Sequence, residues 1–358
     1  MHCTNTIQHR RTTTSRKGSA GADGGFGSQT RMHSGNRAMI KRICLGVIML
    51  AVAGIAQAQP YPSKPIKMIV PWPPGGGVDT AARLISQPLS ERLGQPIVIE
   101  NRPGAAGNIG TALFTKEPAD GYTLLMGSLS PNAVNPHLYS KLGFDPVKDF
   151  EFVALIYTVP SFLVVPTNST VNSAKELVAL AKEKPGKLNF GSGGVGSSQH
   201  LFGVMFNTAT KIDTVHVTYK GTAPAEAALV AGQIDYMLDP PTALPFVTSG
   251  RLKALAVAAP RRSASLPDVP TLDELGIPGV HTSTFYGVMA PVGTPKPIVE
   301  RLNKEINAIL QSPDMQARVA KFAAQTNDWS PEQFAKFVKD EIERYGVIVK
   351  LSGAKQVD

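Results

Sequence analysis

The chain lacks cysteine, a second long apolar run and a large net charge outside its N-terminal segment, and each absence excludes a class of protein. Of the 358 residues only Cys3 and Cys44 are cysteines, and both lie within the first 58 residues. The part from Gln59 onward therefore has no thiol, so disulfides cannot stabilise it. Its length of about 300 residues is enough to bury a large core, and packing must stabilise it instead.

The only long apolar run has the pattern of a secretion signal. Lys41 and Arg42 precede the apolar residues 43–55, and Ala56-Gln57-Ala58 then supplies a small-residue cleavage pattern. The run has 13 residues, whereas a membrane-spanning helix needs about 20, so a membrane anchor is the weaker alternative. We expect residues 1–58 to be a leader in which 39–58 form the signal peptide, with Met39 as the true start. Cleavage after Ala58 would leave a soluble, exported protein.

The positive charge also belongs to the leader. The whole chain has a formal net charge of +9, but residues 1–58 hold eight Lys or Arg and one acid. About +2 therefore remains on the rest of the chain. A nucleic-acid partner requires a basic footprint on the folded domain, so the composition argues against one.

Strand-like and helix-like segments alternate from Pro60 onward, which is typical of an α/β protein with a mainly parallel sheet and helices on both faces. Two amphipathic helices are expected around Ile298–Leu310 and Phe334–Tyr345. Three helix starts have the pattern of a capping box, at Ser173, Thr271 and Ser330. Eight short segments have the composition of strands: Ile66–Val70, Ile97–Glu100, Thr123–Met126, Leu163–Val165, Leu188–Phe190, Thr214–Tyr219, Ile234–Leu238 and Leu252–Ala258.

The chain is long for a single sheet, so we predict two Rossmann-like lobes joined by two crossover strands. Crossings are expected near Ile156–Ser161 and Thr284–Ala290, two short extended segments with Pro or Gly beside them. Lobe 1 would then comprise 59–160 plus 284–358, and lobe 2 would comprise 161–283. In such folds ligands bind beyond the carboxyl ends of the strands.

The loop after the first predicted strand is the most informative segment. Val70 ends the strand, a loop rich in Pro and Gly follows, and helical spacing begins at Thr80. This order leaves backbone N–H groups of a helix N-terminus free to bind an anion. The glycines allow a ligand to approach the backbone closely, and Trp72 would form an apolar wall. A side chain at Gly77 should therefore block binding and leave the fold intact.

The arrangement of strand, small-residue loop and helix recurs in four further loops, so we expect five loops to present backbone donors and hydroxyls to one site. Such a site could bind a small carboxylate without an arginine. For Asp79 and Asp239 a helix-capping role is the favoured alternative, and His200 could instead pack beneath the cleft. The candidate ligand-binding residues are Trp72, Gly75, Gly76, Gly77, Asp79, Ser128, Asn132, Ser192, Ser197, Ser198, His200, Tyr219 and Asp239.

Two other functions have some support in the sequence. Gly191–Gly196 matches the dinucleotide pattern G-x-G-x-x-G, but Asp213 precedes the following predicted strand instead of ending it. An exported serine hydrolase could use Ser197 or Ser198 with His200, but no G-x-S-x-G elbow and no third partner are present. The histidines beyond the leader have no metal-ligand spacing. We therefore expect neither an enzyme nor a cofactor or metal site.

Nine motifs run through nearly the whole mature chain: Tyr61–Ile66, Val70–Asp79, Glu100–Gly110, Pro118–Leu125, Asp145–Phe150, Lys184–Phe190, Val217–Pro224, Val269–Thr271 and Ala290–Pro295. In these motifs the chain resembles the substrate-binding proteins of tripartite tricarboxylate transporters, the Bug family of periplasmic receptors. The resemblance implies a two-lobed periplasmic binding protein fold, type II-like, that closes on a small carboxylate partly through backbone N–H groups and bridging waters. It also implies delivery to a two-subunit membrane permease, and we expect a monomer. Many members have Phe where this chain has Trp72, and Gly77 is often another small residue, so the ligand stays open among aromatic and aliphatic carboxylates, amino acids and citrate.

Overall fold

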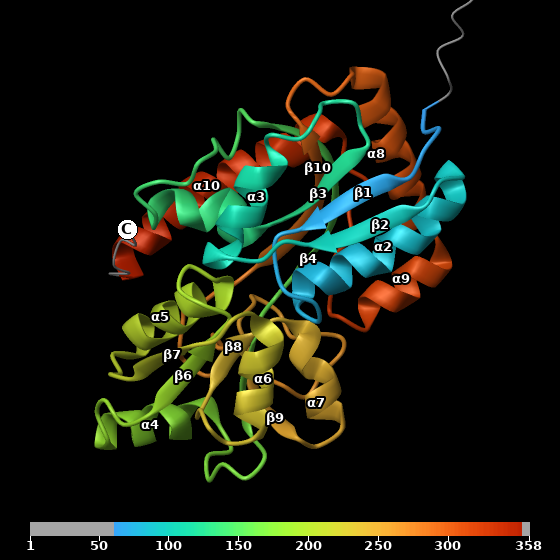
Figure 1. Cartoon of the computed structure of the whole chain (residues 1–358). Helices are drawn as coiled ribbons and strands as arrows, with labels where there is room; N and C mark the ends of the chain where they lie inside the picture. The colour runs from blue at the N-terminus through green and yellow to red at the C-terminus, as the bar shows by residue number, and fades with distance from the viewer. Residues whose placement is uncertain (1–60, 353–358) are drawn as a thin grey trace, which may run out of the picture. The chain divides into compact units, whose positions relative to one another are not determined.

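The structure of the protein, a computed structural model, describes residues 61–352, with the side chains of the last two left undescribed (Figure 1). These residues belong to one compact unit that begins at Gln59. The predicted leader, with its cysteines and cleavage site, lies outside the described residues. Among the residues that are described, no helix is both long and apolar enough to cross a membrane.

The first group of strands forms a five-stranded sheet of order β2-β1-β3-β10-β4. Strand β1 runs parallel to β2 and β3, whereas β10 runs antiparallel to both β3 and β4. Four of the five strands therefore run in the same direction, so the prediction of a mainly parallel sheet is confirmed apart from β10. The two antiparallel pairings arise because β10 returns from a distant part of the chain and inserts between β3 and β4. The strands are β1 (Ile66–Val70), β2 (Ile97–Asn101), β3 (Thr123–Ser128), β4 (Phe150–Val159) and β10 (Thr284–Pro291).

The second group combines a three-stranded antiparallel sheet, β8-β5-β9, with a parallel pair, β6-β7. A single bridge between Phe190 and Tyr236 connects the parallel pair to the segment that precedes β8. In this group β5 alone runs antiparallel to its neighbours, so one reversed strand interrupts the predicted parallel arrangement, as β10 does in the other sheet. The strands are β5 (Phe162–Pro166), β6 (Asn189–Ser192), β7 (Val215–Thr218), β8 (Met237–Asp239) and β9 (Leu252–Val257).

Each of the eight predicted strands overlaps an observed strand, and the two predicted crossings fall on β4 and β10. The crossings are longer than expected, since β4 has ten residues and β10 has eight. Along β10 the side chains alternate between two cores, because successive residues of a strand point to opposite faces. Phe285 and Met289 pack with Phe334, whereas Tyr286 and Val288 pack in the core that contains Leu302.

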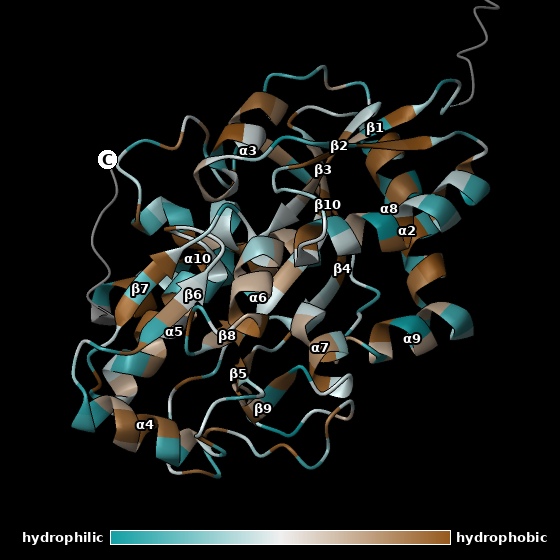
Figure 2. Ribbon diagram, turned by 60° about the horizontal axis from the view of Figure 1, so that its bottom comes forward, coloured by the Kyte–Doolittle hydropathy of each residue, from teal (hydrophilic) through white to brown (hydrophobic). Residues whose placement is uncertain are grey.

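Helices cover both faces of the five-stranded sheet. Helices α2 (Gly77–Leu93) and α8 (Lys296–Leu310) supply one core, and α3 (Asn108–Phe114) and α10 (Pro331–Ser352) supply the other. Hydrophilic and hydrophobic residues alternate along these ribbons, as amphipathic helices require (Figure 2). The remaining helices are α4 (Ala174–Glu183), α5 (Ser198–Thr210), α6 (Thr222–Val230), α7 (Leu244–Thr248) and α9 (Pro313–Ala320).

Two of the three predicted capping boxes begin a helix, and the third does not. At Ser330 both reciprocal bonds form before α10, and at Ser173 the hydroxyl accepts from the Glu176 backbone N–H at the start of α4. At Thr271 both bonds with Glu274 form too, at 3.0 and 3.1 Å, yet only a turn follows. That helix start is wrong because Gly276 and Pro278 come before a second helical turn can form.

Candidate functional site

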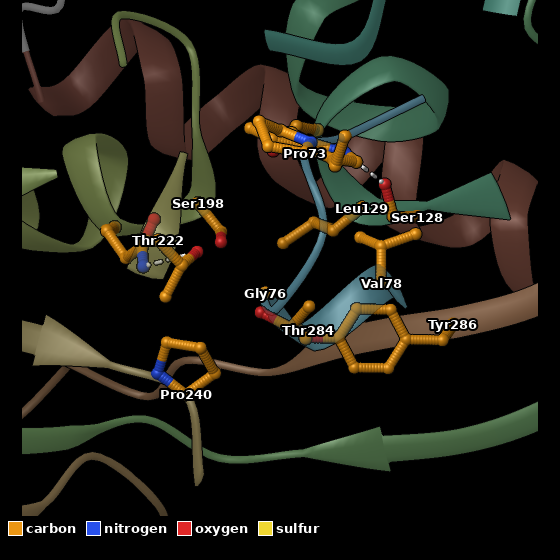
Figure 3. A pocket seen from close by; sticks show the side chains of 14 residues that line it. Pro73, Gly76, Val78, Ser128, Leu129, Ser198, Thr222, Pro240, Thr284 and Tyr286 are labelled. Carbon is orange, nitrogen blue, oxygen red and sulfur yellow. Dashed lines mark hydrogen bonds between the residues drawn. The ribbon is translucent and has the colours of Figure 1, made fainter. Parts of the chain in front are cut away.

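A pocket lies where the ends of β1 and β3 meet the starts of three helices (Figure 3). Its walls come from both groups of strands. Trp72, Pro73, Gly76, Gly77, Val78, Ser128, Leu129, Ser130, Thr284 and Tyr286 lie on the side of the five-stranded sheet, and Ser198, Gln199, Thr222 and Pro240 lie on the other.

Three helices begin at the pocket wall: α2 at Gly77, α5 at Ser198 and α6 at Thr222. The start of α5 is capped, because the Ser197 hydroxyl accepts from the His200 backbone N–H. Within the described residues no side chain caps α2 or α6. The first N–H groups of these two helices therefore have no side-chain partner, and the helix dipole makes both ends favourable for an anion.

Two hydroxyls, one on each side of the pocket, have an acceptor position that is already occupied. Trp72 Nε1 donates to Ser128 Oγ at 3.3 Å, and Gln199 Nε2 donates to Thr222 Oγ1 at 3.0 Å. The orientation of the Gln199 amide is fixed because its Oε1 accepts from the Gly193 backbone N–H at 3.2 Å. Each hydroxyl can therefore direct its own proton toward a ligand.

The lining residues carry no charged side chain. The pocket thus offers hydrogen-bond donors, two helix N-termini and apolar surface from Trp72, Val78 and Leu129. A group that accepts several hydrogen bonds and carries negative charge suits this lining best. A cation would face the partial positive charges of the hydrogen-bond donors instead.

Five of the predicted ligand-binding residues line the pocket, and eight do not. The five are Trp72, Gly76, Gly77, Ser128 and Ser198. The eight that stand outside the lining are Gly75, Asp79, Asn132, Ser192, Ser197, His200, Tyr219 and Asp239.

Asp79 holds the first loop in place behind the pocket. Its carboxylate accepts from Arg83 Nε at 2.8 Å, from Gly75 N at 3.0 Å and from Asn101 Nδ2 at 3.0 Å. Burial acts to raise the pKa of Asp79, but these hydrogen bonds outweigh it and keep the pKa below its usual value. Asp79 therefore fixes the loop that begins α2, in line with the favoured structural role, and a direct contact with the ligand stays a prediction.

Three other predicted residues also support the walls. Asn132 is fully buried and its Oδ1 accepts from the Ser128 backbone N–H at 3.2 Å, which fixes the position of Ser128. The His200 ring accepts from Gly196 N at 3.3 Å and stacks on His216 with 4.2 Å between ring centroids. Ser197 caps α5, as described above.

The arrangement needed for a serine hydrolase does not form at Ser197 or Ser198, because the ring nitrogen of His200 bonds the backbone instead of a hydroxyl. A close Ser–His pair does occur between Ser192 Oγ and His216 Nε2, at 2.7 Å. However, Ser192 is 0% exposed, and burial lowers the pKa of His216 to about 4. The lining residues include no histidine, and no metal-binding group of three or more His, Cys, Asp or Glu exists among the described residues.

The glycines of the G-x-G-x-x-G segment pack against the protein itself. A Cβ at Gly191 would lie 2.2 Å from the Ile234 side chain, and one at Gly193 would lie 3.1 Å from the Gly221 backbone. Close packing explains these glycines without a bound diphosphate, so the nucleotide alternative is not favoured.

The sequence reasoning missed Gln199, Thr222, Thr284 and Tyr286. Gln199 and Thr222 lie inside loops that the sequence singled out, but their role depends on a bond between those loops. Tyr286 comes from β10 and no local pattern reveals it. A Cβ at Gly77 would lie only 2.2 Å from the Tyr286 hydroxyl oxygen, so the expectation that a side chain at Gly77 leaves the fold intact is wrong.

Known proteins match nearly the whole described chain. Residues 81–354 match the family described as tripartite tricarboxylate transporter family receptor. BugT from Bordetella pertussis is 40% identical over 316 residues, which cover 86% of this chain and 96% of BugT. A "UPF0065 protein in tcbD-tcbE intergenic region" from Pseudomonas sp. (strain P51) is 38% identical over 314 residues. These cover 86% of this chain and 93% of that protein.

Solved structures agree in fold. An R. palustris protein determined with adipate has a TM-score of 0.81 at 35% identity and covers 83% of this chain and 100% of its own. MatC from Rhodopseudomonas palustris with bound malate has a TM-score of 0.77 at 35% identity. The match covers 81% of this chain and 100% of MatC. The periplasmic binding protein BugD has a TM-score of 0.79 at 34% identity. The match covers 83% of this chain and 100% of BugD.

These matches confirm the predicted fold class, a two-lobed α/β periplasmic binding protein fold, and they confirm the resemblance found in the motifs. Family members are periplasmic substrate-binding receptors. The chain belongs to the receptor family of the tripartite tricarboxylate transporters.

Proposed function

We propose that this protein is a periplasmic receptor that captures a small carboxylate in the pocket between Trp72 and Thr222 and delivers it to a tripartite tricarboxylate-type permease. The observation that carries the proposal is the polarity of the lining. Two helix N-termini lack a side-chain cap, and two hydroxyls already accept from Trp72 and Gln199, so the lining faces a ligand mainly with donors. The relatives solved with adipate and malate support a small carboxylate as the ligand.

The donors are sufficient for useful affinity. A helix N-terminus favours an anion by about 0.3–2 kcal/mol, depending on burial. A hydrogen bond to a charged group contributes about 1.5–3 kcal/mol. Two of each give several kcal/mol, which is of the same order as the roughly 8 kcal/mol of a micromolar complex.

We infer lobe limits of 59–160 plus 284–358 for lobe 1 and 161–283 for lobe 2. The change of sheet between β4 and β5, and again between β9 and β10, supports these limits. The two connecting segments lie side by side, since Ser161 N donates to Thr282 Oγ1 at 3.2 Å, and this pair is a suitable hinge. A Cβ at Gly76 would be 3.6 Å from Thr222 Cβ, so the two lobes touch at the pocket, as a closed receptor requires.

The same proposal makes the protein a monomeric receptor without catalytic activity, released into the periplasm by cleavage after Ala58. The buried position of Ser192 and the backbone bond of the His200 ring favour a receptor over a hydrolase. The closed lobes would form the surface that a two-subunit membrane permease recognises.

Calorimetry with adipate, malate, citrate and benzoate tests the proposal, with hexanediamide as the uncharged counterpart of adipate. At least one carboxylate should bind with micromolar or better affinity, and the diamide should bind at least a hundredfold more weakly. Equal binding of the diamide, or binding of none of the carboxylates, would contradict the proposal. Ester turnover that disappears in Ser192→Ala would favour the hydrolase instead.

Scattering with and without the bound carboxylate tests the hinge. Ligand contacts to both lobes form only in the closed state, so binding should reduce the radius of gyration. An unchanged radius at saturating ligand would contradict hinge closure while leaving the binding function intact.

A further inference from the structure

Behind the Gln199–Thr222 wall of the pocket lies a buried pair of carboxyl groups that the proposed binding function does not use. Asp239 is the last residue of β8 and is 0% exposed, and Glu226 lies on α6 and is 4% exposed. Acidic side chains are seldom buried this deeply unless they are paired.

The pair is connected to the pocket through one side chain. Asp239 Oδ1 accepts from Gln199 Nε2 at 2.9 Å, and the same nitrogen donates to Thr222 Oγ1 at 3.0 Å. Glu226 lies one turn along the helix that begins with Thr222. Any change of charge on the pair therefore acts on the donor wall of the pocket at short range.

The arrangement requires a proton between the two carboxyls. Asp239 Oδ2 and Glu226 Oε1 are both buried, and neither has a hydrogen-bond donor among the described residues. Two adjacent carboxylates cannot both be ionised at low cost in free energy. With one shared proton, the protonated carboxyl group donates a hydrogen bond to the ionised one. Burial raises the pKa of both groups, and for Asp239 the charge and the hydrogen bond of Glu226 raise it further.

The groups that face the pair do not compensate a second negative charge. From α5 comes the neutral Gln199 amide, from the segment after β8 the Thr242 hydroxyl, and from β5 Phe162 pairs with Asp239. From β10 comes Tyr286, whose pKa is raised by burial and then by the charges of the pair. Arg251 lines the same groove as Glu226, but it lies on the outer side and is exposed.

We propose that the Glu226–Asp239 pair makes ligand capture proton-linked: the pair holds its shared proton while the pocket holds an anion, and loss of that proton weakens binding. This inference rests on the proposed function. The proton passes between the pair and solvent, and the groove beside Glu226 provides the route. Deprotonation places a second negative charge behind Gln199 and Thr222, where it repels the ligand carboxylate.

Calorimetric titration with adipate between pH 6.5 and 9 tests the inference, in two buffers that differ in ionisation enthalpy. Adipate is ionised throughout this range, since alkyl carboxylates titrate near pH 4.3. In the wild-type protein the affinity should fall as the pH rises, by roughly threefold to thirtyfold over the full titration of the pair. Binding should also take up protons, visible as a buffer-dependent heat.

The matched control is the double variant Asp239→Asn with Glu226→Gln, which has the shape of the protonated pair but cannot titrate. Its adipate affinity should not change with pH, and its binding heat should not depend on the buffer. If the double variant unfolds in a thermal melt, Glu226→Gln alone is used, and its pH dependence should differ from that of the wild type. Asp239→Leu removes the acceptor of Gln199 and should weaken binding at every pH.

The outcomes separate this inference from the proposed function. Adipate binding that is independent of pH in the wild type, without proton uptake, overturns the inference and leaves the receptor function standing. A double variant that keeps the wild-type pH dependence also overturns it, because the proton would then come from elsewhere. If none of adipate, malate, citrate and benzoate binds at any pH, the proposed function and this inference fall together.

Discussion

The two walls of the pocket use the same device, a hydroxyl that accepts from a fixed nitrogen donor, but they anchor it differently. On the first wall Trp72 donates to Ser128, and the indole packs where a Cβ at Gly107 would be only 3.2 Å from its Nε1. On the second wall Gln199 donates to Thr222 and also to the buried Asp239. The indole N–H has no acid–base role in proteins, whereas the anchor of Gln199 is a carboxyl group whose pKa is raised by burial and by Glu226.

This difference divides the site into a permanent half and an adjustable half. The loop of the first wall is held by Asp79, Arg83 and Asn101, whose bonds are already complete without a ligand. The second wall depends on the protonation of Asp239 and Glu226. Substitutions on the first wall should therefore change affinity equally at all pH values, and those on the second should change its pH dependence.

The largest expected effect follows from Gly77→Val, on the first wall. The new Cβ would lie 2.2 Å from the buried Tyr286 hydroxyl, so Tyr286 must move and the start of α2 must shift. Overpacking of this kind costs about 1–3 kcal/mol of folding stability. We expect adipate binding to be lost in calorimetry and the melting temperature to fall by several degrees.

Gly76→Ala is the control for that variant. Gly76 has a φ of −84°, and an added Cβ would meet Thr222 at 3.6 Å, an ordinary contact. Its folding stability should change by less than about 0.5 kcal/mol. If Gly76→Ala destabilises the protein as much as Gly77→Val, Tyr286 is not the cause.

Ser128→Ala and Thr222→Val should each weaken carboxylate binding by roughly tenfold to a hundredfold, the value of one hydrogen bond to a charged group. Because the two hydroxyls lie on opposite walls, their effects should add in the double variant. Ser192→Ala is a control, since Ser192 is buried beneath the Gly193 loop and does not line the pocket. A double variant no weaker than either single variant would mean that only one hydroxyl reaches the ligand.

The fold could be predicted from the sequence to the extent that it is encoded locally. Ile66–Val70 and Thr123–Met126 carry strand composition, and Ser330 carries a complete capping box, so these elements lie where they were expected. The antiparallel insertion of β10 could not be found this way, because strand composition does not encode which neighbours a strand pairs with. The turn at Thr271 has the correct capping chemistry but is followed by Gly276 and Pro278 too early for a helix.

The pocket lining was predictable where it consists of loop residues near a strand end, as at Gly76, Gly77 and Ser128. It was not predictable where two distant loops cooperate, as at Gln199 and Thr222. Asn132 was expected at the ligand because polar residues after strands often lie there, but its Oδ1 accepts from Ser128 N. Asp239 likewise lies behind the lining and accepts from Gln199. The sequence does not show which polar side chain lines a pocket and which one supports its wall.

A smaller effect is expected on stability in acid, on the second wall. Phe190, His216 and His200 form a stack beneath the Gly193 loop, and burial lowers the pKa of both histidines from 6.5 to about 4. The unfolded chain therefore takes up protons first as the pH falls, so folding stability is lost between pH 6.5 and 4.

Thermal melts across that range measure the loss, and His216→Phe provides the comparison. The variant keeps an aromatic ring in the stack but removes one of the two titrating groups, so its melting temperature should depend less steeply on pH. An equal slope in variant and wild type would assign the acid sensitivity to other groups.

The smallest expected effect is that of Trp72→Phe, which tests whether the first wall is as independent of pH as its anchor suggests. The variant keeps an aromatic surface at the pocket but removes the Nε1 donor to Ser128, a bond that is long at 3.3 Å. The Ser128 hydroxyl keeps its place, because Asn132 still holds the Ser128 backbone, so it can still donate to a carboxylate. We expect adipate affinity to fall by no more than roughly tenfold, the upper value of one weak neutral hydrogen bond. The loss should be the same at pH 6.5 and pH 9, because neither Trp72 nor Ser128 has a hydrogen bond to Glu226 or Asp239. A loss that grows with pH would show that the two walls are coupled, and the division into a permanent and an adjustable half would then be wrong.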